Sequence, residues 1–327
     1  MPLHRVALIG VPLLALLVAA CGGGTSEPAG AGERPVEARD PDSVGLLLAG
    51  YPVYDDPTSG LRVIFGTPDL GLGTHRVAFA LTNPAEELVR LPILRAASYY
   101  YPRGASGPRE GPVEQATARF FEFPFGTRGI YSTELVLDRV GDWGLELTLP
   151  QADGGSVSST FLFPVAERTN APAVGDLAPA SASRTAADVG SLAELSTGHE
   201  PDAALYRLSI ADTLAEGRPF VVVFASPAFC TNALCGPQVE VLSELAARHG
   251  DRANFLHVDL YENPHEIHGD LDRAVRTPVL EEWGVHTDEW TFIVDAEGRV
   301  AGRFEAFVTE EELEQALLSV LDALFEG

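Results

Sequence analysis

The residues best suited to chemistry in this chain of 327 residues are three cysteines, Cys21, Cys230 and Cys235. Cys230 and Cys235 are separated by four residues and lie among polar residues such as Ser226 and Thr231. A cysteine reacts as the thiolate, and polar, partly exposed surroundings favour that form more than the apolar surroundings of a structural cysteine. The pair therefore predicts thiol–disulfide chemistry.

The C-x4-C spacing limits where the two cysteines can lie. On one regular helix their Cα atoms would be about 8–9 Å apart, and a disulfide spans at most about 7 Å. A bond can form if Cys230 lies in a loop and the helix begins near Pro237, a residue suited to the first helical turn. Three interpretations stay open from the residues alone, which are a working redox pair, a static disulfide and a pair of metal ligands.

An alternation of strands and helices must position this pair. The predicted elements from residue 200 to 327 are a strand at 220–225, a helix at 237–249, a strand at 254–260, a short helix at 277–283, a strand at 290–295, its hairpin partner at 299–307 and a last helix that opens with the capping box Thr309…Glu312. The strand at 220–225 is apolar throughout, which is typical of a strand buried on both faces.

This order resembles the thioredoxin superfamily over Ala203–Phe325. The resemblance rests on the stretch Phe220–Pro237, which carries both cysteines after a central strand, and on the late hairpin Phe292–Val300. It implies an α/β thioredoxin-like domain in which Cys230, near a helix N-terminus, is the nucleophile and Cys235 the resolving thiol. It also implies protein thiols or disulfides as partners and no cofactor.

The segment before the predicted hairpin departs from the family pattern. Thioredoxin-like oxidoreductases have a cis-proline facing the cysteines, whereas Gly284–Phe292 contains no proline. Asp288 and Glu289 are expected to raise the pKa of a nearby thiol by repelling the thiolate unless they face away. Trp290 is expected to form a wall of the site.

A Sco-like copper-binding chaperone is the alternative function. Sco-type proteins resemble this region in having two cysteines, spaced C-x3-C, and a histidine shortly before the hairpin strand. His286 has that location here, so Cys230, Cys235 and His286 would hold copper in this interpretation. Two thiolates and an imidazole are a soft ligand set that suits copper. A non-catalytic module with a structural disulfide is the other alternative.

Other histidines offer weaker metal patterns. His265 and His268 stand at i and i+3, but Asn263-Pro264 and the neighbouring acidic residues favour a solvated turn, and His75 is solitary.

The resemblance to peroxiredoxins is weak, because Val223 and Pro227 stand at the positions where that family has a proline and a threonine.

The N-terminus predicts export and lipid anchoring. Residues 1–20 have a basic start and a short apolar run, as in a secretory signal peptide. The end of that run, Val18-Ala19-Ala20-Cys21, resembles the lipobox of bacterial lipoproteins, which implies lipidation of Cys21. Residues 21–44 are expected to be a flexible linker. The expected location is the cell membrane, with the protein lipid-anchored and facing the periplasm or the cell exterior.

A second folded region is expected between the two linkers. Residues 45–166 contain short alternating runs between turn signals, which predicts an all-β immunoglobulin-like sandwich with Trp143 in its core. The predicted strands are Leu61–Gly66, His75–Thr82, Phe120–Pro124, Gly129–Leu137, Gly144–Leu149 and Ser156–Phe163. Residues 167–199 are rich in Ala, Pro, Ser and Gly, which indicates a linker to the thioredoxin-like domain at 200–327. The predicted fold class is therefore two-domain.

The charge balance argues against nucleic acid as a partner. The chain carries 47 acidic and 22 basic residues, a net charge of −25, which repels a phosphate backbone. From Glu200 onward 25 acidic residues face 8 arginines, so −17 of the charge lies in the predicted redox domain. Acidic partners are disfavoured for the same reason.

Overall fold

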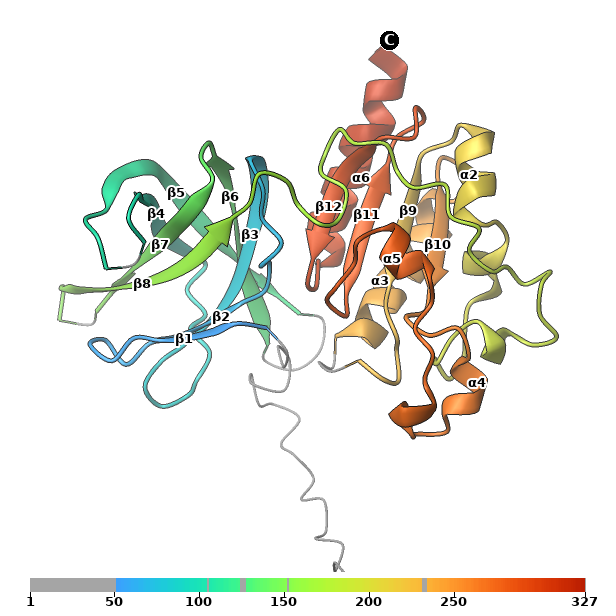
Figure 1. Ribbon diagram of the computed structural model, residues 1–327, viewed down its shortest axis with the longest axis horizontal. Coiled ribbons are helices and arrows are strands. Elements are labelled where there is room, and N and C mark those ends of the chain that lie inside the picture. The colour runs from blue at the N-terminus through green and yellow to red at the C-terminus, as the bar shows by residue number, and fades with distance from the viewer. Residues whose placement is uncertain (1–50, 105, 124–127, 152, 231–233, 327) are drawn as a thin grey trace, which may run out of the picture. The chain divides into compact units, whose positions relative to one another are not determined.

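The computed structural model describes residues 51–104, 106–123, 128–151, 153–230 and 234–326, which all belong to one compact unit, Asp40–Gly327. The predicted signal peptide, the predicted lipidation site Cys21 and the predicted linker 21–44 lie outside the described residues. Two sheets, one of eight strands and one of four, form the framework of the described chain (Figure 1).

The first sheet is antiparallel throughout. Its order is β1-β2-β3-β6-β5-β4-β7-β8. The strands are β1 (Val53–Asp55), β2 (Arg62–Phe65), β3 (Gly73–Thr82), β4 (Ile93–Tyr101), β5 (Glu110–Glu122), β6 (Gly129–Leu137), β7 (Gly141–Pro150) and β8 (Ser156–Val165). The longest, β5, has 13 residues and pairs with β6 through one part of its length and with β4 through another.

This sheet curls until its two ends face each other. Phe161 on β8 packs against Phe65 on β2 and Phe79 on β3, with ring centroids 5.3 and 5.7 Å apart. Trp143 is fully buried in the same core, as the sequence predicts, and its indole N–H donates to the carbonyl of Arg139. The prediction of an immunoglobulin-like sandwich of two sheets needs correction, because all eight strands hydrogen-bond into one nearly closed sheet.

The six predicted strands all fall within strands of this sheet or overlap them by most of their length, but the three-residue β1 and the longer β4 were not predicted. The buried positions of β4 alternate correctly, yet the residues there are small or polar, such as Ala96 and Ser98 beside Leu94. The hydrophobic signal of a half-buried strand is weak with such residues. The tyrosines of this strand pack under arginines, with the Arg109 guanidinium 3.7 Å from the Tyr99 ring centroid.

The second sheet has the order β10-β9-β11-β12. Its strands are β9 (Phe220–Phe224), β10 (Asn254–Val258), β11 (Trp290–Val294) and β12 (Val300–Glu305). β9 and β10 run parallel, while β11 is antiparallel to both β9 and β12. Every residue of β9 and β11 is buried, as expected for central strands covered on both faces.

Helices cover both faces of this sheet (Figure 1). Helices α3 (Cys235–His249) and α6 (Glu310–Glu326) pack on one face, and α2 (Ile210–Glu216) and α5 (Val279–Glu282) on the other. The first face is filled by Val221, Val223, Leu242, Leu245, Ile293, Leu313 and Leu317, and the second by Ile210, Phe220, Val222, Phe224, Leu280, Trp283 and Phe292. The remaining helical turns are α4 (Pro264–Ile267), η1 (Leu192–Glu194), η2 (Ala203–Tyr206) and η3 (Leu271–Arg273).

The segment between the two sheets, predicted as a linker, lies along the second sheet. Gly175 N–H donates to the carbonyl of Val300 and Val300 N–H donates to Asp176, so this segment pairs briefly with β12. Ala171 and Ala178 are buried in the core beside α5. The segment therefore contributes side chains to the packing around the second sheet.

The start of α6 forms half of the predicted capping box. The Thr309 hydroxyl accepts the backbone N–H of Glu312 at 3.3 Å. The Glu312 carboxylate does not reach back and instead accepts from Arg76 on β3 at 2.7 Å and from Ser132 on β6 at 3.0 Å. A charged hydrogen bond to Arg76 outcompetes the return bond of the box because it is stronger.

Candidate functional site

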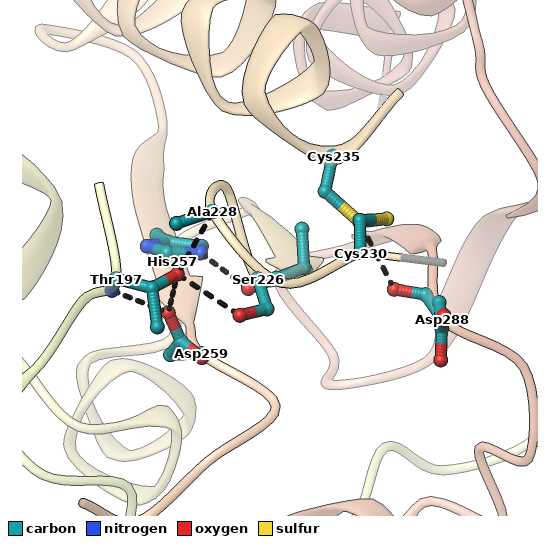
Figure 2. The surroundings of a disulfide bond; sticks show 9 residues. Thr197, Ser226, Ala228, Cys230, Cys235, His257, Asp259 and Asp288 are labelled. Carbon is teal, nitrogen blue, oxygen red and sulfur yellow. Dashed lines mark hydrogen bonds between the residues drawn. A yellow bond between two sulfur atoms is a disulfide. The ribbon is translucent and has the colours of Figure 1, made fainter. Parts of the chain in front are cut away.

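The candidate site is the Cys230–Cys235 disulfide, which lies after β9 (Figure 2). Cys230 is in the loop before α3, and Cys235 is the first residue of that helix. Their Cα atoms are 6.0 Å apart, within the range that a disulfide spans. The prediction that Cys230 must lie outside the helix to permit a bond is therefore confirmed.

The helix begins earlier than predicted. It starts at Cys235 rather than near Pro237, so Cys235 occupies the position where unpaired N–H groups and the helix dipole act most strongly. Cys230, which was expected near that position, lies five residues earlier because the four-residue insert separates the two sulfurs. Cys230 is half-buried and Cys235 is fully buried.

The turn before β11 covers Cys235. The Cys235 sulfur lies 3.4 Å from the carbonyl oxygen of Asp288 (Figure 2). Glu289, the residue before β11, is fully buried, and burial followed by the charge of Asp288 raises the pKa of its carboxyl to about 8. Glu289 is consequently neutral near pH 7, so it does not repel a thiolate as the sequence had suggested.

Trp290 was expected to form a wall of the site and is instead part of the core. It is 1 % exposed and stacks on Phe292 with ring centroids 5.4 Å apart. Its indole N–H donates to the Thr287 hydroxyl at 2.8 Å. The Arg303 guanidinium lies over the Trp290 ring, 4.6 Å from the ring centroid.

A polar network lies on the other side of the disulfide (Figure 2). Asp259, which directly follows β10, accepts the Thr197 N–H at 2.7 Å and the Thr197 hydroxyl at 2.9 Å. The Thr197 hydroxyl oxygen is also 2.9 Å from that of Ser226 and accepts the N–H of Ala228 at 3.2 Å. Burial raises the pKa of the Asp259 carboxyl to about 6, opposed by the hydrogen bonds from Thr197.

A second set of hydrogen bonds, made by His257 on β10, holds the chain at the end of β9, just before this loop. His257 Nε2 lies 2.9 Å from the carbonyl oxygen of Ala225, and its Nδ1 lies 2.6 Å from the hydroxyl of Tyr206. Burial lowers the pKa of His257 to about 4. The ring is therefore neutral at pH 7, and a proton on Nε2 satisfies both contacts.

Sequence reasoning missed Thr197, Asp259 and His257. Thr197 stands in a stretch that its composition marks as a linker. Asp259 carried a usable signal, because it lies near the end of the strand predicted at 254–260, and a helix between two strands favours parallel pairing with the strand before Cys230. The carboxyl ends of parallel strands meet at one edge of a sheet, so the two loops had to be neighbours.

The histidines proposed as metal ligands do not form a cluster in the described part of the chain. His286 is exposed and stands two residues before Asp288. His265 lies in α4 and His268 ends that helix with a left-handed backbone, φ 49°, so the pair does not share one helical face. Among the described residues no group of three or more His, Cys, Asp or Glu side chains is placed to hold a metal ion. Copper binding by Cys230, Cys235 and His286 stays a prediction.

No helix within the described residues is both long and apolar enough to span a bilayer. No protein-family model matches the chain, and no curated protein matches it either.

Several solved structures are similar to parts of this chain. A thiol:disulfide interchange protein DsbE from Chlorobium tepidum has 18% identity and a TM-score of 0.34, over 46% of this chain and 99% of its own. A thioredoxin-family thiol:disulfide interchange protein from Chlorobium tepidum TLS has 14% identity and a TM-score of 0.28, over 35% and 86%. The exposed lipoprotein thioredoxin of Streptococcus pneumoniae has 19% identity and a TM-score of 0.26, over 32% and 89%. The chain's own strand order β10-β9-β11-β12, with the cysteine loop directly after β9, gives this portion a thioredoxin-like fold.

Proposed function

We propose that this protein carries out thiol–disulfide exchange with protein thiols or disulfides through Cys230 and Cys235. The observation that carries the proposal is the disulfide itself, which joins a half-buried loop cysteine to a buried cysteine at a helix N-terminus. This asymmetry gives the two sulfurs different tasks, because only a sulfur that a partner can reach is open to attack.

In the oxidising direction a partner thiolate attacks the Cys230 sulfur. The Cys230–Cys235 bond breaks, its electron pair leaves on Cys235, and a mixed disulfide joins Cys230 to the partner. A second partner thiolate then attacks the partner sulfur of that mixed disulfide and releases Cys230 as a thiolate. The partner gains a disulfide, the protein gains two thiols, and the protons of the partner thiols balance the charge. The reducing direction is the reverse sequence, with Cys230 as nucleophile and Cys235 as resolving thiol.

The position of Cys235 supports its role as leaving group. A leaving thiolate departs faster when its pKa is low, and the N-terminus of a helix such as α3, 15 residues long, favours negative charge. The carbonyl of Asp288 beside Cys235 can then accept the S–H of the reduced thiol. The helix N-terminus therefore favours the thiolate that leaves when the bond breaks, and the Asp288 carbonyl favours the thiol that forms when this thiolate is protonated.

The reduction potential of the pair tests the proposal. We expect a value above about −300 mV, in the range of disulfides that exchange, measured by equilibration of the purified protein with glutathione or dithiothreitol buffers. A potential below about −300 mV would assign the disulfide a structural role and end the proposal.

Trapping in intact cells provides a second test. In a Cys235→Ser variant the mixed disulfide on Cys230 cannot be resolved from within the protein, so partner adducts are expected to accumulate on non-reducing gels. The double variant Cys230→Ser/Cys235→Ser is the control and should form none. Equal adduct levels in the two variants would contradict the role of Cys230.

We further propose that Cys21 carries a lipid that anchors the protein at the cell membrane, facing the periplasm or the cell exterior. The support is the sequence Val18–Cys21 after a short apolar run. Each buried methylene of an acyl chain contributes about 0.8 kcal/mol, so two or more chains hold a protein stably on a bilayer. Extracytoplasmic compartments also permit disulfides to persist.

Loss of the anchor is the predicted result of Cys21→Ala. Fatty-acid label should be incorporated by the wild type and by Cys230→Ala, and not by Cys21→Ala, whose protein should leave the membrane fraction. Label on Cys21→Ala, or wild-type protein without label, would refute lipidation at this residue.

A further inference from the structure

Two side chains at the end of β10 tie down the loop that carries Cys230. His257 and Asp259 are two residues apart and therefore point to the same side, where His257 contacts the carbonyl of Ala225 and Asp259 contacts Thr197. The Thr197 hydroxyl in turn receives the N–H of Ala228, two residues before Cys230. The loop is thus fixed at two successive points on the way to the reactive sulfur.

The hydroxyl of Thr197 uses its full bonding capacity in this arrangement. A hydroxyl has one proton to donate and two lone pairs to accept with. The proton goes to the Asp259 carboxylate at 2.9 Å, and the lone pairs face the N–H of Ala228 at 3.2 Å and the hydroxyl of Ser226 at 2.9 Å. Asp259 is 4 % exposed and Ser226 is fully buried, so water does not substitute freely for the bonds to these two residues, whereas the bond from the Ala228 N–H lies at the exposed edge of the network.

We propose that Asp259 and Thr197 are positioning residues for exchange at Cys230, acting by fixing the Ser226–Cys230 loop through the shared hydroxyl of Thr197. This inference rests on the proposed function, because it concerns the rate of the same exchange step. Neither residue contacts the sulfurs. Their effect comes from holding Cys230 where Cys235 or a partner thiolate can attack in line, and misplacement of a reacting atom by about 1 Å can cost 100-fold in rate.

The ionisation of Asp259 matters to this network. The Thr197 N–H and O–H both point to one carboxylate oxygen, and the N–H of Tyr261 donates to the other at 3.2 Å. The groups around the carboxylate are Thr197, Ser226, Tyr206 and Tyr261, together with the neutral His257 on its own strand. Hydrogen bonds rather than a cation therefore hold the charge, and protonation near pH 6 loosens the loop.

The test compares variants of Thr197 by the rate at which dithiothreitol reduces the disulfide. Thr197→Val keeps the shape of the side chain and removes the hydroxyl, and we expect the rate constant at pH 7.5 to fall about tenfold. Thr197→Ser restores the hydroxyl and should restore the wild-type rate. Thr117→Val, at an exposed position on β5, is the matched control and should react as the wild type does.

A pH profile separates positioning from a general loss of stability. The wild-type rate constant, corrected for the thiolate fraction of dithiothreitol, should show an inflection near pH 6 that Asp259→Asn lacks. Thermal unfolding of each variant identifies any that is unfolded at the assay temperature, and Ser226→Ala then replaces Thr197→Val in the comparison.

The outcomes distinguish this inference from the proposed function. If the wild type exchanges and Thr197→Val does so at the same rate, or if the inflection persists in Asp259→Asn, the positioning role is refuted while the proposed function stands. If the wild-type disulfide has a structural potential and forms no adducts, the proposed function fails, and the positioning role fails with it.

Discussion

Replacing Asp69 with alanine is expected to lower the free energy of unfolding by about 3–5 kcal/mol, because it removes one partner of a buried ion pair. The Asp69 carboxylate lies 2.5 Å from the Arg303 guanidinium, and the two side chains are 12% and 6% exposed. It also accepts the backbone N–H groups of Asn170 and Ala171 at 2.9 and 3.0 Å. The variant leaves a buried arginine without its carboxylate and two backbone groups without acceptors.

Urea unfolding of the purified protein measures this change as a shift in the midpoint at constant slope. Asp55→Ala is the control, since Asp55 pairs with Arg62 at 2.7 Å but the side chains are 67% and 42% exposed. An exposed pair contributes at most about 1 kcal/mol. Adding Arg303→Met to Asp69→Ala should recover part of the loss by removing the buried charge. Equal effects of Asp69→Ala and Asp55→Ala would contradict the argument.

Stability is expected to fall as the pH rises from 6.5 to 8.5, and Glu289 is the main cause. Burial, followed by the charge of Asp288, raises the pKa of Glu289 from 4.5 to about 8, and neither carboxyl oxygen has a hydrogen-bond partner. The folded state therefore binds a proton that the unfolded state has already lost, so the contribution is complete below pH 4.5 and disappears as the pH passes 8. At about 1.4 kcal/mol per pH unit, Glu289 accounts for about 2 kcal/mol of loss in this interval.

The other buried groups with a shifted pKa change stability less than Glu289 does between pH 6.5 and 8.5. The pKa of His257 is lowered to about 4 and that of Asp259 is raised to about 6, so both complete most of their titration below pH 6.5. Burial raises the pKa of Glu305 to about 7, and this residue adds a smaller loss of the same sign. The groups that act on Glu289 are Asp288 on its own turn and Arg76 on β3.

Glu289→Gln is the variant that tests this assignment, because it keeps the shape and removes the ionisation. Its unfolding free energy should fall less steeply between pH 6.5 and 8.5 than that of the wild type. Glu297→Gln makes the same chemical change at an exposed turn position and should keep the wild-type slope. A wild-type protein that is equally stable at both pH values, or a Glu289→Gln variant with the wild-type slope, would refute the prediction.

The elements of the second sheet could be predicted because their signals are local. β9 and β11 are short and mostly apolar runs, α3 ends at His249 as predicted, and the prediction for β10 differs from the structure by two residues at one end. The C-x4-C spacing also excluded both cysteines from one helix, since that conclusion needs only helix geometry. The resemblance to the thioredoxin superfamily depends on this order of elements and was therefore visible in the sequence.

The pairing of the first sheet could not be predicted from such signals. Which strands become neighbours depends on hydrogen bonds between distant segments, such as β3 with β6 and β4 with β7. The alternation on β3 or β6 predicts a half-buried strand equally well in two packed sheets and in one curled sheet. The contact of Phe65 with Phe161, 96 positions later, belongs to the curl of the sheet and to no local pattern.

The sequence by itself determined that two cysteines follow a central strand of an α/β region and can be joined only through a loop, because residue spacing and helix geometry set those limits. Tertiary structure decided the surroundings of that disulfide. Thr197 arrives from a stretch without regular structure, Asp259 from the neighbouring strand, and Glu289 becomes neutral only by burial. Charge state and hydrogen bonding depend on which atoms exclude water around a group, and that is fixed only when the whole chain has packed.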